Sequence, residues 1–224
     1  ISAHGFTAES VDGVANRLTA LLVTTFAQGK FYLLFSFLFG YSASFILRDN
    51  SKPNRRRYLR RMLALFLFGL AHAVFFFIGD ILITYSIFGL LLFTVSRSSD
   101  RALKRWTIAA ITVAVLLILV VASLAAAFPD DFSESGGLES ALSTGTFAEA
   151  AIARLEALPS TLLGVFLLQG PMAFAAFVLG LRASRVKLLA DPESHVDLWR
   201  KLARWGWAIG LPLQAVAAGM QIGA

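Results

Sequence analysis

The stretch from Gly69 to Tyr85, GLAHAVFFFIGDILITY, places a histidine and an aspartate inside an otherwise apolar run. Ionisable groups in such a run are costly, and by default they face a water-filled cavity or a partner. Histidine changes its charge near neutral pH and often serves as a general base. The sequence therefore predicts His72 as a catalytic base, with Asp80 either orienting it or binding a cation.

Thr84 and Tyr85 follow Asp80 by about one helical turn. If the chain reverses at Gly79 and Asp80, Tyr85 falls at roughly the depth of His72 on the neighbouring antiparallel helix. We expect the four polar side chains to line one outward-opening cavity, in which Thr84 and Tyr85 contact the substrate.

Structural roles are the alternative for the same pair. His72 would donate to a backbone carbonyl across a helix interface. Asp80 would cap a helix that begins at Ile81, because a carboxylate at this position accepts from free N–H groups and favours the positive end of the helix dipole. The sequence leaves both readings open.

Two further polar residues are candidate substrate contacts. Lys30 lies at the outer rim of an apolar run, where it would bind an acidic headgroup or substrate, or snorkel to the water interface. Gln169 precedes Gly170 and Pro171 in the middle of another run. Proline removes one helical hydrogen bond, so a kink is expected there, either lining a pathway or serving packing alone.

The elements that position these residues are predicted to be transmembrane helices. The chain of 224 residues is 57% hydrophobic and only 15% charged, well below the roughly 25% typical of soluble domains. Several apolar runs approach the 20 or so residues needed to cross a bilayer. We expect an all-α, polytopic membrane protein that forms a single transmembrane domain over 1–224. Its six predicted spans cover 30–47, 58–78, 80–95, 106–127, 160–181 and 203–222.

Charge alternates between the connections of these spans. Seventeen of the twenty Lys and Arg residues lie within 48–61, 96–105 and 182–204, whereas 128–159 holds six acidic residues and a single arginine. The positive-inside rule places the three basic connections in the cytoplasm and 128–159 outside. Residues 1–29 would then be external, with an interfacial or re-entrant helix over 11–27. Helical spacing also predicts a short helix over 147–158, and 195–207 suits a headgroup region.

Several functions are disfavoured by what the sequence lacks. It has no cysteine, no phosphate-binding G-x-x-x-x-G-K-[ST] loop and no G-x-S-x-G, and its three histidines are too dispersed for an H-E-x-x-H zinc site. We therefore expect no metal and no ATP hydrolysis. The basic segment RRRYLRR lies between two spans, which favours a topology signal over nucleic-acid binding.

Three motifs in order resemble the YeiB-like family of bacterial inner-membrane proteins, domain of unknown function 418. They are GKFYLLFSFLFGYS from Gly29, GLAH from Gly69, and GDILITY from Gly79. The resemblance is strongest over residues 29–95. Family members usually carry a further span before this region and more helices after it, so we expect the chain to be a piece of a longer protein.

The resemblance implies an activity class, because this family is similar to transmembrane acyltransferases that modify sugars or lipids at the outer face. We expect transfer of an acyl group to an envelope glycan or glycolipid in the bacterial inner membrane. The donor would be an acyl-CoA or a lipid-borne acyl group, and membrane lipids would be the surrounding partners. Two alternative functions stay open, namely an ion-coupled transporter or permease and a non-catalytic membrane subunit.

Overall fold

The computed structural model describes residues 30–47, 51–128 and 136–223, together with Asn16, Thr19, Leu22 and Val23. All regular structure in these residues is helical, so the predicted all-α class is confirmed for this part of the chain. The interfacial helix predicted over 11–27 lies outside the described residues, apart from those four. The principal helices are α2 (Lys30–Leu47), α3 (Lys52–Phe75), α4 (Leu82–Val95), α5 (Asp100–Ala127), α6 (Gly136–Thr144), α7 (Phe147–Leu168), α8 (Gly170–Arg185), α9 (Val196–Trp205) and α10 (Leu211–Gly223).

Four of these helices, α2, α3, α5 and α7, are long and apolar enough to cross a membrane. Their surfaces are not hidden inside the fold. In α5, for example, only 11% of the apolar window is buried, and Leu116 and Leu119 are more than half exposed. Exposed apolar surface on this scale marks a lipid or protein contact rather than a water-facing surface. The described helices therefore indicate a membrane protein.

The helix boundaries differ from the six predicted spans in three places. Helix α4 is apolar but only 14 residues long. The predicted span over 160–181 is divided between α7 and α8, and α7 begins as early as Phe147. The predicted span over 203–222 is not among the helices with spanning length and hydropathy, because α9, a short π-helical segment (Gly206–Gly210) and α10 divide that region.

The start of α7 explains why the predicted boundary at 159/160 is wrong. Thr146 and Glu149 form a capping box, in which each side chain accepts from the other residue's backbone N–H. The helix then continues through Pro159, while Leu158 packs against Ala73 and Ile83. The helix predicted over 147–158 is present, but it is the first half of a longer one.

Helix α8 occupies the centre of the molecule, with ten of its sixteen residues buried. It crosses α2 where two glycines meet the opposite backbone. A Cβ on Gly40 would lie 1.9 Å from the carbonyl oxygen of Phe177, and one on Gly180 would lie 1.9 Å from that of Phe37. The face of α2 that carries Gly40 therefore packs closely against α8, and the stacked rings of Phe39 and Phe177 extend the contact.

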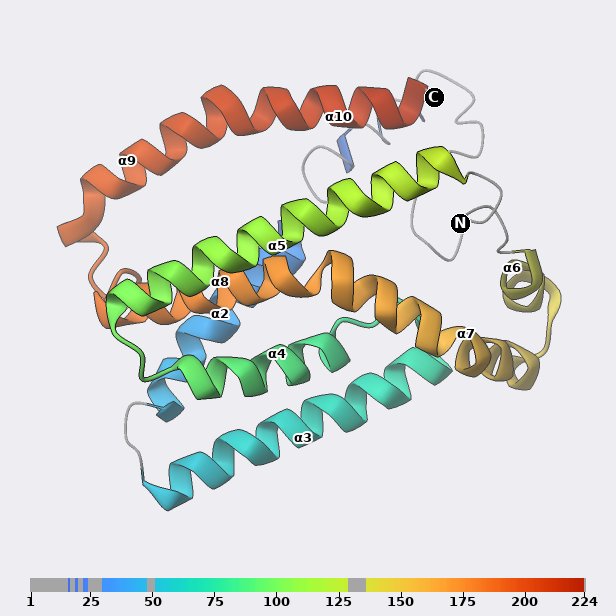
Figure 1. The fold of residues 1–224 in the computed structure, drawn as a ribbon, viewed down its shortest axis with the longest axis horizontal. Coiled ribbons are helices and arrows are strands. Elements are labelled where there is room, and N and C mark those ends of the chain that lie inside the picture. The colour runs from blue at the N-terminus through green and yellow to red at the C-terminus, as the bar shows by residue number, and fades with distance from the viewer. Residues whose placement is uncertain are drawn as a thin grey trace.

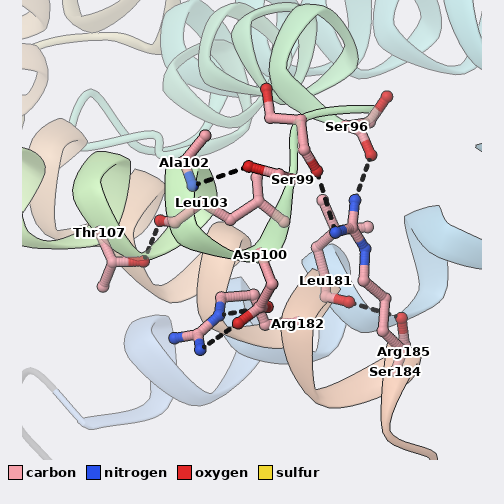
Figure 2. Close-up of polar contacts among 11 residues, drawn as sticks. Ser96, Ser99, Asp100, Ala102, Leu103, Thr107, Leu181, Arg182, Ser184 and Arg185 are labelled. Carbon is pink, nitrogen blue, oxygen red and sulfur yellow. Dashed lines mark hydrogen bonds and ion pairs between the residues drawn. The ribbon is translucent and has the colours of Figure 1, made fainter.

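The helix connections gather at two opposite ends (Figure 1). The α4–α5 and α8–α9 connections share one end, where Arg182 forms a bidentate ion pair with Asp100 at 2.9 and 3.0 Å (Figure 2). The α3–α4 turn and the start of α7 share the other end, where the rings of Phe75 and Phe147 stack. One end is thus held by an ion pair and the other by stacked aromatic rings.

Candidate functional site

The candidate site is the turn that joins α3 to α4. Helix α3 ends when the carbonyl oxygen of His72 accepts from the backbone N–H groups of both Phe76 and Phe77, each at 2.9 Å. Six residues, 76–81, then reverse the chain before α4 begins. His72 therefore lies in the last turn of one helix, and Asp80 lies just before the first turn of the next.

Asp80 caps α4 with one carboxylate oxygen. Its Oδ1 accepts from the backbone N–H of Leu82 at 2.7 Å and from that of Ile83 at 3.2 Å. The carboxylate is only 3% exposed, so these bonds replace water that burial removed. Asp80 accepts from the free N–H groups as the capping role predicts, although α4 begins at Leu82 and not at Ile81. The positive end of the α4 dipole further stabilises the carboxylate charge.

The other carboxylate oxygen, Oδ2, lies 2.8 Å from Nδ1 of His72. A carboxylate only accepts, so neutral His72 carries its proton on Nδ1 and leaves a lone pair on Nε2. The histidine side chain is 45% exposed, against 3% for its partner. The arrangement is a buried, fixed carboxylate behind an accessible imidazole, which is the geometry of an oriented general base.

Gly69 lets the two helices approach closely enough for this contact. A Cβ at this position would lie 2.8 Å from Oδ1 of Asp80 and 2.8 Å from the backbone nitrogen of Ile83. Residues three apart share a helix face, so Gly69 and His72 meet the α4 turn together. The role of Gly69 was missed in the sequence analysis, although its spacing to His72 was a signal that could have revealed it.

Aromatic rings flank the imidazole on its own side of the turn. The rings of Phe76 and Phe77 have centroids 6.0 and 6.5 Å from that of His72. These apolar neighbours limit the imidazole's freedom of rotation and cover part of its surface.

Tyr85 lies in a different environment from the one predicted. Its hydroxyl donates to the carbonyl oxygen of Tyr32 at 2.6 Å and lies 2.7 Å from Oγ of Ser36, which also bonds to that carbonyl. The side chain is 6% exposed and its ring packs against those of Phe39 and Phe177. The hydroxyl of Tyr85 is thus bonded to α2 and does not point to the imidazole of His72.

The remaining predicted contacts are also spread over the molecule. Thr84 is buried at 1% exposure, and Lys30 is exposed as the first residue of α2. Gln169 is half-buried at the break between α7 and α8, where its backbone bonds to Val165 and Ala173. Of the six predicted site residues, His72 and Asp80 are the two that the structure joins by a hydrogen bond.

No group of three or more metal-ligating side chains occurs in the described part of the chain. The dyad of His72 and Asp80 offers one imidazole nitrogen and no third ligand.

The chain is similar to the uncharacterized protein YxaH of Bacillus subtilis (strain 168), with 26% identity over 228 residues. The match covers 90% of this chain and 54% of the relative, so the chain spans about half the relative's length. No protein-family model and no solved structure matches the chain.

Proposed function

We propose that this protein is a membrane acyltransferase of the YeiB type, which transfers an acyl group to a hydroxyl of an envelope glycan or glycolipid. One observation carries the proposal: the 2.8 Å contact between Nδ1 of His72 and a buried Asp80 whose other oxygen is held by two backbone N–H groups. Such a dyad is costly in an apolar region and is suited to removing a proton.

In the proposed reaction, Nε2 of His72 accepts the proton of the acceptor hydroxyl as its oxygen attacks the acyl carbonyl carbon. Asp80 stabilises the imidazolium that forms, because its carboxylate lies against Nδ1. Collapse of the tetrahedral intermediate breaks the bond to the donor's sulfur or oxygen. The departing group takes the proton back from Nε2, so the histidine ends as it began. The donor is a thioester, as in acyl-CoA, or an ester borne by a lipid.

The proposed topology has six spans in the bacterial inner membrane. Helices α2, α3, α4 and α5 provide four of them, the broken pair α7–α8 a fifth, and residues 203–222 a sixth, with an interfacial helix over 11–27. The basic connections face the cytoplasm and the dyad faces the outside. Support comes from the two ends of the molecule, since the basic α4–α5 and α8–α9 connections lie opposite the α3–α4 turn (Figure 1).

The test is a comparison of envelope lipids and glycans by mass spectrometry between wild type and His72→Ala. We expect one acylated species to fall by about a hundredfold or more, because general-base catalysis contributes roughly 10²–10⁴ in rate. The control is His195→Gln, which removes a half-buried histidine at the opposite end. An unchanged profile at equal protein level contradicts acyl transfer and supports a non-catalytic subunit.

Proton-coupled transport is the second candidate, and the break at Gln169 favours it. Pro171 has no N–H to donate to the carbonyl of Leu167, and broken helices often line transport sites. Transport predicts uptake into vesicles driven by a pH gradient and abolished by His72→Ala, with no change in any acylated species. The two candidates therefore differ in which measurement responds to the same substitution.

A further inference from the structure

A cavity of about 800 Å³ lies at the end of the molecule opposite the dyad. Three elements line it: the last turns of α2, the α4–α5 connection, and the end of α8 with the turn that follows. The dyad is at the α3–α4 turn, so this cavity is a separate feature that acyl transfer does not use.

Three cationic side chains line the cavity: Arg97, Arg185 and Lys187. Arg185 donates to the carbonyl oxygens of Ser98 at 3.0 Å and Ser96 at 2.8 Å, which fixes its guanidinium beside the α4–α5 connection (Figure 2). An arginine has five N–H donors, so these two bonds leave its charge and further donors available.

One acid, Asp191, also lines the cavity. Both its carboxylate oxygens accept from Ser194, one from the hydroxyl and one from the backbone N–H. These bonds, with smaller contributions from the charges of His195 and Lys187, hold the pKa of Asp191 below its usual range, so the carboxylate stays ionised. It sets one negative charge against the three cations. The lining keeps an excess of positive charge, which favours an anionic occupant.

Lys187 stands at a backbone position that favours glycine. Its φ of 55° is left-handed, and it ends α8 in a Schellman motif. The N–H of Leu188 bonds to the carbonyl of Ala183 at 2.9 Å, and that of Lys187 bonds to the carbonyl of Ser184 at 3.1 Å. A lysine here is strained where glycine is not, and strained residues concentrate at functional sites. Lys187 therefore holds its charge at the cavity in a backbone conformation that is unfavourable for lysine.

Part of the cavity lining is apolar. Phe45 is 65% exposed and Leu47 is half-buried, both in the last turn of α2, and Leu181 contributes from α8. Helix α2 is one of the helices with the length and hydropathy of a membrane span, so its end lies at the level of lipid headgroups. Positive charge beside an exposed apolar wall at that level matches an amphiphilic anion.

We propose that this cavity binds the headgroup phosphate of an anionic phospholipid, with Arg97, Arg185 and Lys187 around the phosphate and the acyl chain along Phe45 and Leu47. The proposal is independent of acyl transfer. A soluble phosphate shares the headgroup's charge but lacks the chain, so the experiment below includes both.

The experiment is native mass spectrometry of the purified protein in a non-ionic detergent, titrated with phosphatidylglycerol, with phosphatidylcholine, or with inorganic phosphate. Phosphatidylglycerol should bind at least about tenfold more tightly than phosphatidylcholine. Lys187→Gly should weaken phosphatidylglycerol binding about tenfold, the size expected for one charge-assisted contact. Because glycine suits this φ, the midpoint of thermal unfolding should stay constant or rise, which separates lost binding from misfolding.

The matched control is Lys52→Gln, which removes an exposed lysine from a different basic cluster on the first turns of α3. It should change phosphatidylglycerol binding by less than about twofold, given a specific cavity contact. Equal weakening by Lys52→Gln and Lys187→Gly would show bulk charge attraction and overturn the proposal. Inorganic phosphate that displaces the lipid at millimolar concentration would also overturn it, in favour of a soluble ligand.

Discussion

At the scale of single residues, the His72–Asp80 dyad depends on one carboxylate that serves two purposes. Oδ1 caps α4 and Oδ2 holds the imidazole, so the structural and chemical readings of Asp80 are compatible. Sequence reasoning identified both residues because they stand out as ionisable groups in an apolar run. It assigned Gly69 no role: the spacing of three residues to His72 was a signal, but how closely α3 and α4 approach is set by tertiary packing.

The surroundings of Tyr85, by contrast, were not predicted from the sequence. Its depth was estimated from chain length, but the direction of its side chain depends on which helix packs against α4. The partners Ser36 and Tyr32 lie about fifty residues earlier in the chain. No local pattern in the sequence indicates a contact over that separation.

We predict that Tyr85→Phe lowers stability without abolishing function. The substitution removes the hydroxyl that bonds to the Tyr32 carbonyl, while the Ser36 hydroxyl retains its own bond to the same oxygen. A cost of about 1 kcal/mol is expected, the usual net worth of such a bond. Thermal unfolding in detergent measures the cost, and envelope mass spectrometry measures the acylated product. Loss of product at unchanged stability would instead identify Tyr85 as a substrate contact.

At the scale of elements, the crossing of α2 and α8 holds the centre of the fold together. Two glycines face the opposite helix backbone there, and α8 lies inside the bundle instead of facing lipid. Nothing in the sequence indicated that α8 would be the partner, since 160–181 was predicted as one kinked span.

The crossing leads to a prediction for Gly40→Ala. The added Cβ would lie 1.9 Å from a backbone oxygen of α8, which cannot rotate away, so the helices must separate. We expect destabilisation of about 1–3 kcal/mol, as for other overpacked sites. The matched control is Gly164→Ala, where the new Cβ meets nothing within 4 Å. It should be neutral or stabilising in thermal unfolding. Equal effects of the two substitutions would contradict close α2–α8 packing.

At the scale of the whole molecule, the two ends are chemically distinct. The basic connections and the helix ends that line the phosphate-binding cavity share one end, and the α3–α4 turn that carries the dyad lies at the other (Figure 1). The alternation of charge predicted this separation without any structural information. The helix lengths were less predictable, because the capping box of Thr146 and Glu149 starts α7 at Phe147, well before the span predicted to begin at 160.

We predict that the two ends lie on opposite sides of the inner membrane. The chain has no cysteine, so single cysteines can be labelled without background. In intact cells, Ala148→Cys at the start of α7 should react with a membrane-impermeant maleimide, given access through the outer membrane. Arg101→Cys at the start of α5 should react only after the inner membrane is permeabilised. Both positions are exposed in the fold. Labelling of both in intact cells would contradict the proposed topology.

The central claim is that Asp80 holds the imidazole of His72 with its proton on Nδ1 and a free lone pair on Nε2. Nitrogen-15 NMR of protein labelled at histidine tests this directly at a pH of about 9, where an ordinary histidine is neutral. His72→Ala identifies the signal. We predict a protonated Nδ1 and an unprotonated Nε2 for His72. In Asp80→Asn we predict the opposite tautomer, because the amide oxygen keeps the cap while the amide NH2 group donates to Nδ1. A proton on Nε2 in the wild-type protein, or the same spectrum in Asp80→Asn, would contradict the account.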